Sequence, residues 1–115
     1  MKTALIIISE AAMQNFLTKH LTSMGFKCQT APTMADGLKI LGHTHPDLII
    51  VNDLLAGASG SEVVKYAKSN GHRETPMIAL SYEHQSQKEY KVAHLQRPIQ
   101  VSKLRQCVEC LAKGN

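Results

Sequence analysis

The sequence is short of acidic residues, aromatic residues and cysteine. Nine Asp and Glu stand against thirteen Lys and Arg, which gives the 115-residue chain a formal net charge of +4. Two Phe, three Tyr and no Trp are too few rings to form a stacking surface for bases, so we expect no direct binding of nucleic acid. Three cysteines cannot all pair with one another, which argues against a disulfide scaffold and favours a reducing cytoplasm.

Long apolar runs are also missing. No run approaches the roughly 18 residues of a membrane span, so we expect no insertion into a membrane. The first apolar stretch, Ala4–Ile8, is too short for a secretory signal and lacks a small-residue cleavage pattern. Repeats, linkers and low-complexity segments are absent, and 43% of the residues are apolar. These features predict one domain over residues 1–115 with a sizeable core.

Apolar runs alternate with helical patterns along the chain. Short apolar segments predict strands at Ala4–Ile8, Phe26–Thr30, Asp47–Val51, Pro76–Leu80 and Ala93–Leu95. Apolar residues at three- and four-residue steps predict helices over Ala12–Met24, Thr33–Gly42, Ser61–Ser69 and Val101–Lys113, with Leu54–Gly60 as a loop. In the second helix, Ala35, Leu38 and Leu41 are predicted to share one face. This alternation predicts the α/β class with a parallel sheet, and a binding site at the carboxyl ends of its strands.

Five short motifs follow one another along the predicted strands and their connections. They are Gly25-Phe26, Pro46–Val51, Gly60 eight residues after Asn52, Ile78–Ser81 and Arg97-Pro98. In their order and nearly in their spacing, over almost the whole chain, they resemble the receiver domain of bacterial response regulators in two-component signalling. The resemblance implies a flavodoxin-like fold, a doubly wound five-stranded parallel sheet of order 2-1-3-4-5 with helices on both faces. It also implies a signalling module rather than an enzyme.

The resemblance places an altered phosphorylation pocket in this sequence. Members of the family accept a phosphoryl group from a histidine kinase on an Asp at the end of the third strand, with Mg²⁺, a Lys and a Ser or Thr in contact with it. The acceptor position here holds Asn52, whose neutral amide is a poor nucleophile. Arg97 stands at the lysine position and Ser81 keeps the hydroxyl. The aromatic position three residues before the lysine holds His94.

The acidic pair that follows the first strand in the family is also incomplete. An alignment without a gap places Ile8 and Ser9 there, with Glu10 as the third acid of the run; sliding by one residue places Ser9 and Glu10 there instead. Either register loses at least one carboxylate. Mg²⁺ prefers several oxygen ligands, so we expect its binding to be lost or weak and predict no other cofactor.

Asp53 is the alternative phosphoacceptor. It directly follows Asn52, and adjacent residues of a strand point to opposite faces, which disfavours Asp53 in the acceptor role. A second departure lies between Ser81 and Arg97, where fifteen residues replace a longer family segment. The fourth helix is therefore predicted to be short or irregular, within Glu83–Glu89.

Two further constellations fit structural interpretations better than metal sites. Cys107-x-x-Cys110 lies on the closing helix without a second ligand pair nearby in sequence, and Cys107 is in phase with core leucines. The spacing His43-x-His45 suits a surface metal, but no acid or cysteine partner is visible in the sequence, so a polar loop is favoured. No metal ligand is therefore assigned.

The sequence favours a pseudo-receiver, a phosphorylation-independent module that binds proteins in bacterial signalling. Basic residues in the last third would suit an acidic partner, and a homodimer is a further candidate. Two alternatives remain open. One is a working phosphotransfer receiver that uses Asp53, Glu10 and Mg²⁺, and the other is a receiver-derived sensor of a small anion.

Overall fold

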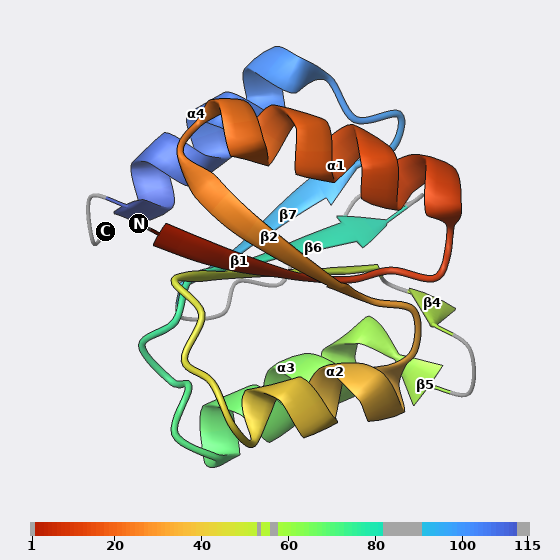
Figure 1. Cartoon of the computed structure of the whole chain (residues 1–115), viewed down its shortest axis with the longest axis vertical. Helices are drawn as coiled ribbons and strands as arrows, with labels where there is room; N and C mark the ends of the chain where they lie inside the picture. Colours follow the sequence, from red (N-terminus) through yellow and green to blue (C-terminus); the bar gives the residue numbers. More distant parts are fainter. Residues whose placement is uncertain (1, 53, 56–57, 82–90, 113–115) are drawn as a thin grey trace.

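The protein is a three-layer α/β domain in which one parallel sheet lies between two pairs of helices (Figure 1). The computed structural model describes residues 2–52, 54–55, 58–81 and 91–112. The sheet strands are β1 (Lys2–Ile7), β2 (Phe26–Ala31), β3 (Leu48–Asn52), β6 (Met77–Ser81) and β7 (Val92–Gln96). Their order is β2-β1-β3-β6-β7, all parallel, which confirms the predicted order 2-1-3-4-5.

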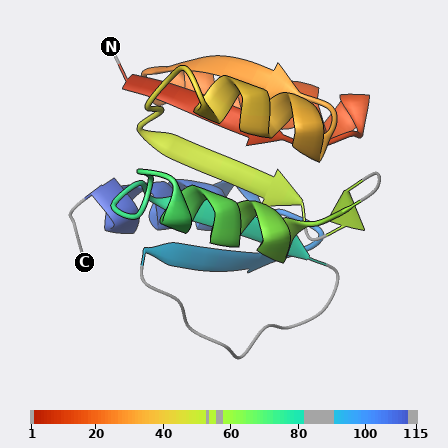
Figure 2. The same cartoon turned by 90° about the horizontal axis from the view of Figure 1, so that it is seen from below.

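The helices of the described chain cover both faces of the sheet. They are α1 (Ala11–Ser23), α2 (Met34–Leu41), α3 (Gly60–Ser69) and α4 (Val101–Ala112). Helices α1 and α4 lie on one face, and α2 and α3 lie on the other (Figures 1 and 2). None of these helices combines the length and the apolar character needed to cross a membrane.

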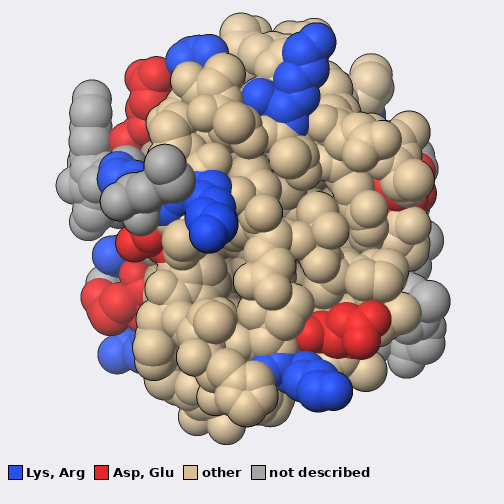
Figure 3. Space-filling model, in the orientation of Figure 1, with Lys and Arg blue, Asp and Glu red and all other residues tan. Residues whose placement is uncertain are grey.

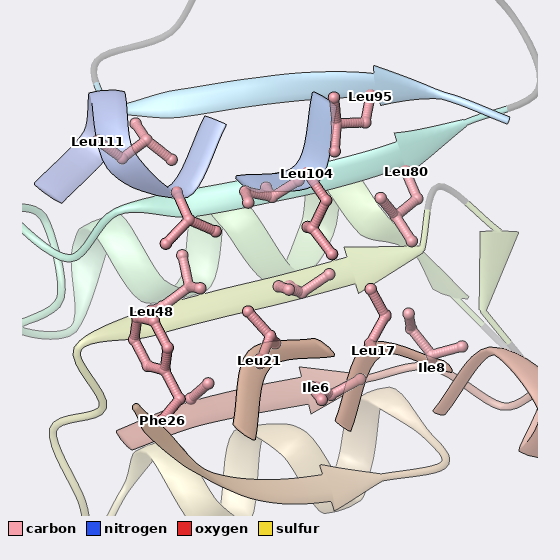
Figure 4. Close-up of a cluster of buried hydrophobic side chains, with 14 residues drawn as sticks. Ile6, Ile8, Leu17, Leu21, Phe26, Leu48, Leu80, Leu95, Leu104 and Leu111 are labelled. Atoms are coloured by element: carbon pink, nitrogen blue, oxygen red, sulfur yellow. The ribbon is translucent and has the colours of Figure 1, made fainter. Parts of the chain in front are cut away.

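The core forms because the central strands are apolar on both faces. In β1 and the residue after it, Ala4, Ile6 and Ile8 pack toward α1 and α4, whereas Leu5 and Ile7 pack toward α2 and α3. The α1 and α4 side gathers Leu17 and Leu104 over the sheet (Figure 4). Every residue of β3 and β6 is buried, so these two strands form the interior of the sheet.

Two local predictions need correction. The segment predicted as a loop contains a short antiparallel pair, β4 (Leu54–Leu55) with β5 (Ala58–Ser59). In α2, Ala35 is exposed although it is predicted to share a face with Leu38 and the buried Leu41. Gly37 is buried there instead, because its missing side chain lets the helix approach Ile7. The predicted fourth helix within Glu83–Glu89 falls outside the described residues.

Candidate functional site

The polar residues of the site lie at the carboxyl ends of the strands, where parallel sheets place their ligands. Asn52 is the last residue of β3 and Ser81 is the last residue of β6. Both are buried, with 5% and 2% of their surface exposed. Arg97 follows β7 directly, so it reaches the same edge of the sheet.

Arg97 joins three parts of this edge. Its Nη2 group donates a hydrogen bond of 2.9 Å to Oδ1 of Asn52 and lies 2.8 Å from Oε1 of Glu10. Its backbone N–H donates to the carbonyl oxygen of Ser81 at 2.7 Å. The side chain of Arg97 is only 7% exposed, whereas that of Glu10 is 47% exposed. A mostly buried guanidinium therefore links the end of β3 to the loop that precedes α1.

The loop after β1 decides which of its three residues reaches Arg97. Ile8 is fully buried in the core cluster beneath α1 and α4, and its backbone N–H donates to the carbonyl oxygen of Ala31. Ser9 is exposed. Glu10 is the N-cap residue of α1 in extended conformation, and its carboxylate turns to Arg97. Ile8, which the alignment without a gap places in the acidic pair, thus belongs to the core rather than to the polar site.

The contacts of Arg97 are charge-assisted. A guanidinium that faces a carboxylate and an amide oxygen gains more than neutral groups would at the same distances. Within the described ranges, no group of three or more His, Cys, Asp and Glu residues could hold a metal ion. Mg²⁺ prefers an octahedron of oxygens that includes carboxylates, and the Oε1 atom of Glu10 already faces a cation. The donor set among these residues therefore does not fit Mg²⁺.

His94 lies on β7, in register with Ala79 of β6. Its neighbours Ala93 and Leu95 pack toward α1 and α4, so strand alternation directs His94 to the opposite face. Both of its ring nitrogens are buried and make no hydrogen bond to the described residues. The alternative acceptor Asp53 lies outside the described residues.

A feature that sequence reasoning missed is an open cavity beside Arg97. It has a volume of about 490 Å³ and is lined by Arg97 together with Ala12, Met13, Phe16, Pro98 and Ile99. Met13 and Phe16 lie within the helix predicted over Ala12–Met24, but no sequence signal indicated that they would share a cavity with Ile99. The cavity places an apolar surface directly beside the polar site.

Two of the thiols lie on the α1 and α4 side of the sheet, where Cys28 and Cys107 are half-buried against the core cluster. Burial raises the pKa of both thiols above the usual value, and the neighbouring Cys110 raises the pKa of Cys107 further. A raised pKa keeps these thiols protonated, which makes them poor nucleophiles.

Comparison with known families gives the same assignment as this geometry. The family model of the response regulator receiver domain matches residues 4–108. The chain belongs to the response regulator receiver family. In this receiver, Asn52 ends β3 and Arg97 follows β7, so the two side chains meet at the carboxyl edge of the sheet.

A curated relative supports the same family. The transcriptional regulatory protein AfsQ1 of Streptomyces coelicolor is 33% identical to this receiver over 81 residues, which make up 70% of this chain and 35% of that protein. The chain thus spans about a third of the length of this relative. The shared part is a receiver domain, the signalling module of two-component systems.

Solved structures share the fold over almost the whole chain. The receiver domain of a histidine kinase from Syntrophus aciditrophicus has a TM-score of 0.88 at 20% identity, covering 99% of this chain and 92% of that one. CheY4 of Vibrio cholerae has a TM-score of 0.86 at 19% identity, with 96% and 98% covered. TrrA of Thermotoga maritima, solved in complex with Mg²⁺-BeF, has a TM-score of 0.85 at 21% identity, with 96% and 99% covered. At these identities the likeness concerns the fold alone.

Proposed function

We propose that this receiver acts without aspartyl phosphorylation, as a protein-interaction module in bacterial signal transduction. The observation that carries the proposal is the contact between Arg97 and Asn52 at the end of β3. Aspartyl phosphorylation needs a carboxylate oxygen to attack phosphorus, and a neutral amide oxygen that accepts a hydrogen bond from a guanidinium is a poor nucleophile.

The guanidinium of Arg97 provides a positive charge within the pocket. In phosphoryl transfer a metal ion neutralises the charge of the phosphoryl oxygens. Here the guanidinium of Arg97 lies between Asn52 and Glu10, and it would repel a divalent ion brought to the same carboxylate. We therefore infer that Mg²⁺ binding is lost or weak and that the pocket holds its shape without a metal.

The surface around the pocket offers the means of interaction. The apolar cavity beside Arg97 opens next to α1, and α4 exposes Lys103 and Arg105. On the face shown in Figure 3, uncharged groups dominate and charges lie mainly toward the rim. We propose a protein partner, with acidic side chains where it meets α4; a second copy of this chain is the alternative occupant.

The test is incubation of the whole chain with acetyl phosphate and Mg²⁺, followed by intact-mass measurement. We expect no gain of a phosphoryl group. A stable adduct would overturn the proposal, and its loss in Asp53→Asn would establish the alternative, a receiver that is phosphorylated on Asp53. Retention of the adduct in Asp53→Asn would instead place the phosphoryl group on another residue.

A gain-of-function series sharpens the same test. Asn52→Asp alone restores the acceptor carboxylate but leaves Arg97 paired with Glu10, so we expect little labelling. Adding Ser9→Asp and Arg97→Lys restores a second acid and a compact ammonium at the positions that the family uses. We expect Mg²⁺-dependent labelling from the triple variant only. Strong labelling of Asn52→Asp alone would show that Arg97 is no obstacle to metal or phosphoryl group.

A sensor of a small oxyanion is the second candidate. It is favoured by the half-exposed carboxylate of Glu10, which an incoming anion could displace from the buried guanidinium of Arg97. A sensor of this kind should gain thermal stability in inorganic phosphate, and more so in Glu10→Gln. A module that acts only by protein interaction should show no shift in either protein.

A further inference from the structure

Two histidines meet at the amino ends of the strands, away from the pocket of Arg97. His45 lies between α2 and β3, and His72 lies between α3 and β6; Figures 1 and 2 show both connections at the end of the molecule opposite β4 and β5. Their ring centroids are 4.9 Å apart, with the planes inclined by 37°. His45 is exposed, whereas His72 is 2% exposed.

The backbone and the ring of His72 are both held in place. Its N–H donates to the carbonyl oxygen of Ala67 at 2.9 Å, and its carbonyl oxygen accepts from Thr75 at 3.2 Å. Its ring Nε2 lies 3.0 Å from the carbonyl oxygen of Leu41, at the end of α2. A carbonyl oxygen can only accept, so Nε2 carries the proton and donates it.

This hydrogen bond leaves the other ring nitrogen of His72 as an acceptor. In a neutral imidazole with a proton on Nε2, Nδ1 bears a lone pair. Nδ1 of His72 is buried and makes no hydrogen bond to the described residues. A buried polar atom without a partner costs stability, so a group that fills this position would be bound favourably.

One ring nitrogen that donates to a backbone carbonyl, with the other left free, is the arrangement of a metal-binding histidine, because the hydrogen bond fixes the tautomer and orients the ring. We propose that His72, through Nδ1, and His45 bind a transition-metal cation of the class that imidazole prefers, with Zn²⁺ as the representative ion. In the part of the chain that the structure describes, no third His, Cys, Asp or Glu joins them into a larger cluster. Water completes the coordination, and the site binds more weakly than a four-ligand zinc site.

The site is independent of the receiver pocket. It links the loop after α2 to the loop after α3, two helices on the same face of the sheet. A cation held by both loops stabilises the folded state by mass action, whether or not the receiver is phosphorylated. The proposal therefore stands or falls separately from the proposed function.

The test is a Zn²⁺ titration followed by long-range ¹H–¹⁵N NMR of the imidazoles, which resolves each histidine and separates this site from zinc bound at thiols. Without zinc we expect the Nε2–H tautomer for His72. With zinc we expect the signals of His45 and His72 to move together, with a parallel rise in Tm. A His72 ring protonated on Nδ1 instead, or signals that do not respond to zinc, would overturn the proposal.

Two matched variants come from one exposed loop. In His45→Gln we expect the zinc affinity of His72 to fall by at least about tenfold, the scale on which loss of even a supporting group weakens a metal site. In His43→Gln, which removes an imidazole two residues away, we expect unchanged affinity. Because His45 is exposed, its replacement leaves the core intact. If His45→Gln binds zinc as tightly as wild type, or if His43→Gln loses as much affinity as His45→Gln, His45 is not a ligand beside His72.

Discussion

The interior of the sheet is apolar, whereas its carboxyl edge carries polar and charged side chains. The interior strands β1, β3 and β6 carry an uninterrupted apolar core, and the fold matches receivers of about 20% identity with TM-scores up to 0.88. At the carboxyl edge, the amide of Asn52 and the guanidinium of Arg97 form a hydrogen bond, and the proposed function assigns this pair to the acceptor and lysine positions of the family. Under that proposal, the receiver keeps its fold while the chemistry of its pocket changes.

The energies of the two regions explain the difference. Burying a Leu or Ile side chain contributes about 1.5–3 kcal/mol, and the core contains many of them. A hydrogen bond to a charged group contributes about 1.5–3 kcal/mol, and Arg97 makes only a few such contacts. Pocket residues can change at a cost that the core tolerates, so the proposed loss of the acceptor carboxylate is compatible with the observed fold.

The largest effect should come from the interior. Leu104 is fully buried between α4 and the sheet, and Leu104→Ala should lower the free energy of unfolding by about 2–5 kcal/mol, as is typical of cavity-forming substitutions. Urea unfolding measures the loss. The adjacent, exposed Lys103→Ala should stay within about 0.5 kcal/mol of wild type. A loss in Leu104→Ala as small as that expected for Lys103→Ala would show that Leu104 adds little to the core.

A close approach in the interior should give the next largest effect. A Cβ atom at Gly37 would lie 2.6 Å from Cδ1 and 2.9 Å from Cγ1 of the buried Ile7. Gly37→Ala should therefore destabilise the protein by about 1–3 kcal/mol through overpacking, against a helix-propensity gain of about 1 kcal/mol.

Gly42 supplies the matched control for Gly37 in the same urea unfolding experiment. It caps the same helix with φ −70°, and a Cβ there would meet its nearest neighbour at 3.4 Å. Gly42→Ala should be neutral or slightly stabilising. A Gly37→Ala protein as stable as Gly42→Ala would show that α2 can move away from β1 at little cost.

The carboxyl edge should respond less than the interior. Arg97→Ala removes the hydrogen bond to Asn52 and the ion pair to Glu10, and it should cost about 1–3 kcal/mol in urea unfolding. Arg97→Lys should recover part of this loss. Glu10→Gln should cost less than about 1 kcal/mol because water can solvate the half-exposed Glu10. Arg105→Ala, which removes an exposed arginine, serves as the control.

The losses of unfolding free energy in these variants show which contact of Arg97 contributes more to stability, the one to Asn52 or the one to Glu10. A Glu10→Gln variant as unstable as Arg97→Ala would mean that the ion pair, rather than the buried hydrogen bond to Asn52, dominates. Mg²⁺ should raise the Tm of none of these proteins. A clear rise in wild type would contradict the inference that Arg97 replaces the metal.

The sheet could be predicted from the sequence because burial on both faces leaves continuous apolar runs, such as Ile49, Ile50 and Val51 in β3. The meeting of Asn52 with Arg97 followed from the topology and from the family resemblance. The register after β1 could not be chosen from the sequence, since Ser9 fits either alignment. The structure shows that Ile8 extends the apolar face of β1 into the core and that Glu10 is the residue of this loop in contact with Arg97.

Other contacts escaped prediction because they depend on three-dimensional proximity. His45 and His72 belong to separate loops, and no spacing rule connects them. The burial of Gly37 in place of Ala35 depends on how closely α2 approaches Ile7, which helical periodicity alone does not determine. The pair of β4 and β5 is only two residues long on each side, too short for a pattern of alternation.

The smallest expected effect is a fall in stability at alkaline pH, which should come from the interior of the sheet and not from its carboxyl edge. Burial raises the pKa of the Cys28 and Cys107 thiols, both packed on the interior cluster, above the usual value of 9.0. Above pH 9.0 the unfolded chain loses these protons while the folded chain keeps them, so stability should fall as pH rises from 9.0 through the folded-state pKa. Well below pH 9.0, where the thiols are protonated in both states, they should contribute no slope.

Urea midpoints measured across this alkaline range test the assignment. The double variant Cys28→Ala and Cys107→Ala should show a shallower decline than wild type. Arg97→Lys, which alters the carboxyl edge and leaves the thiols in place, should keep the wild-type slope. If Arg97→Lys flattens the decline and the cysteine variant does not, the alkaline loss belongs to the pocket, and the interior does not sense pH in this range.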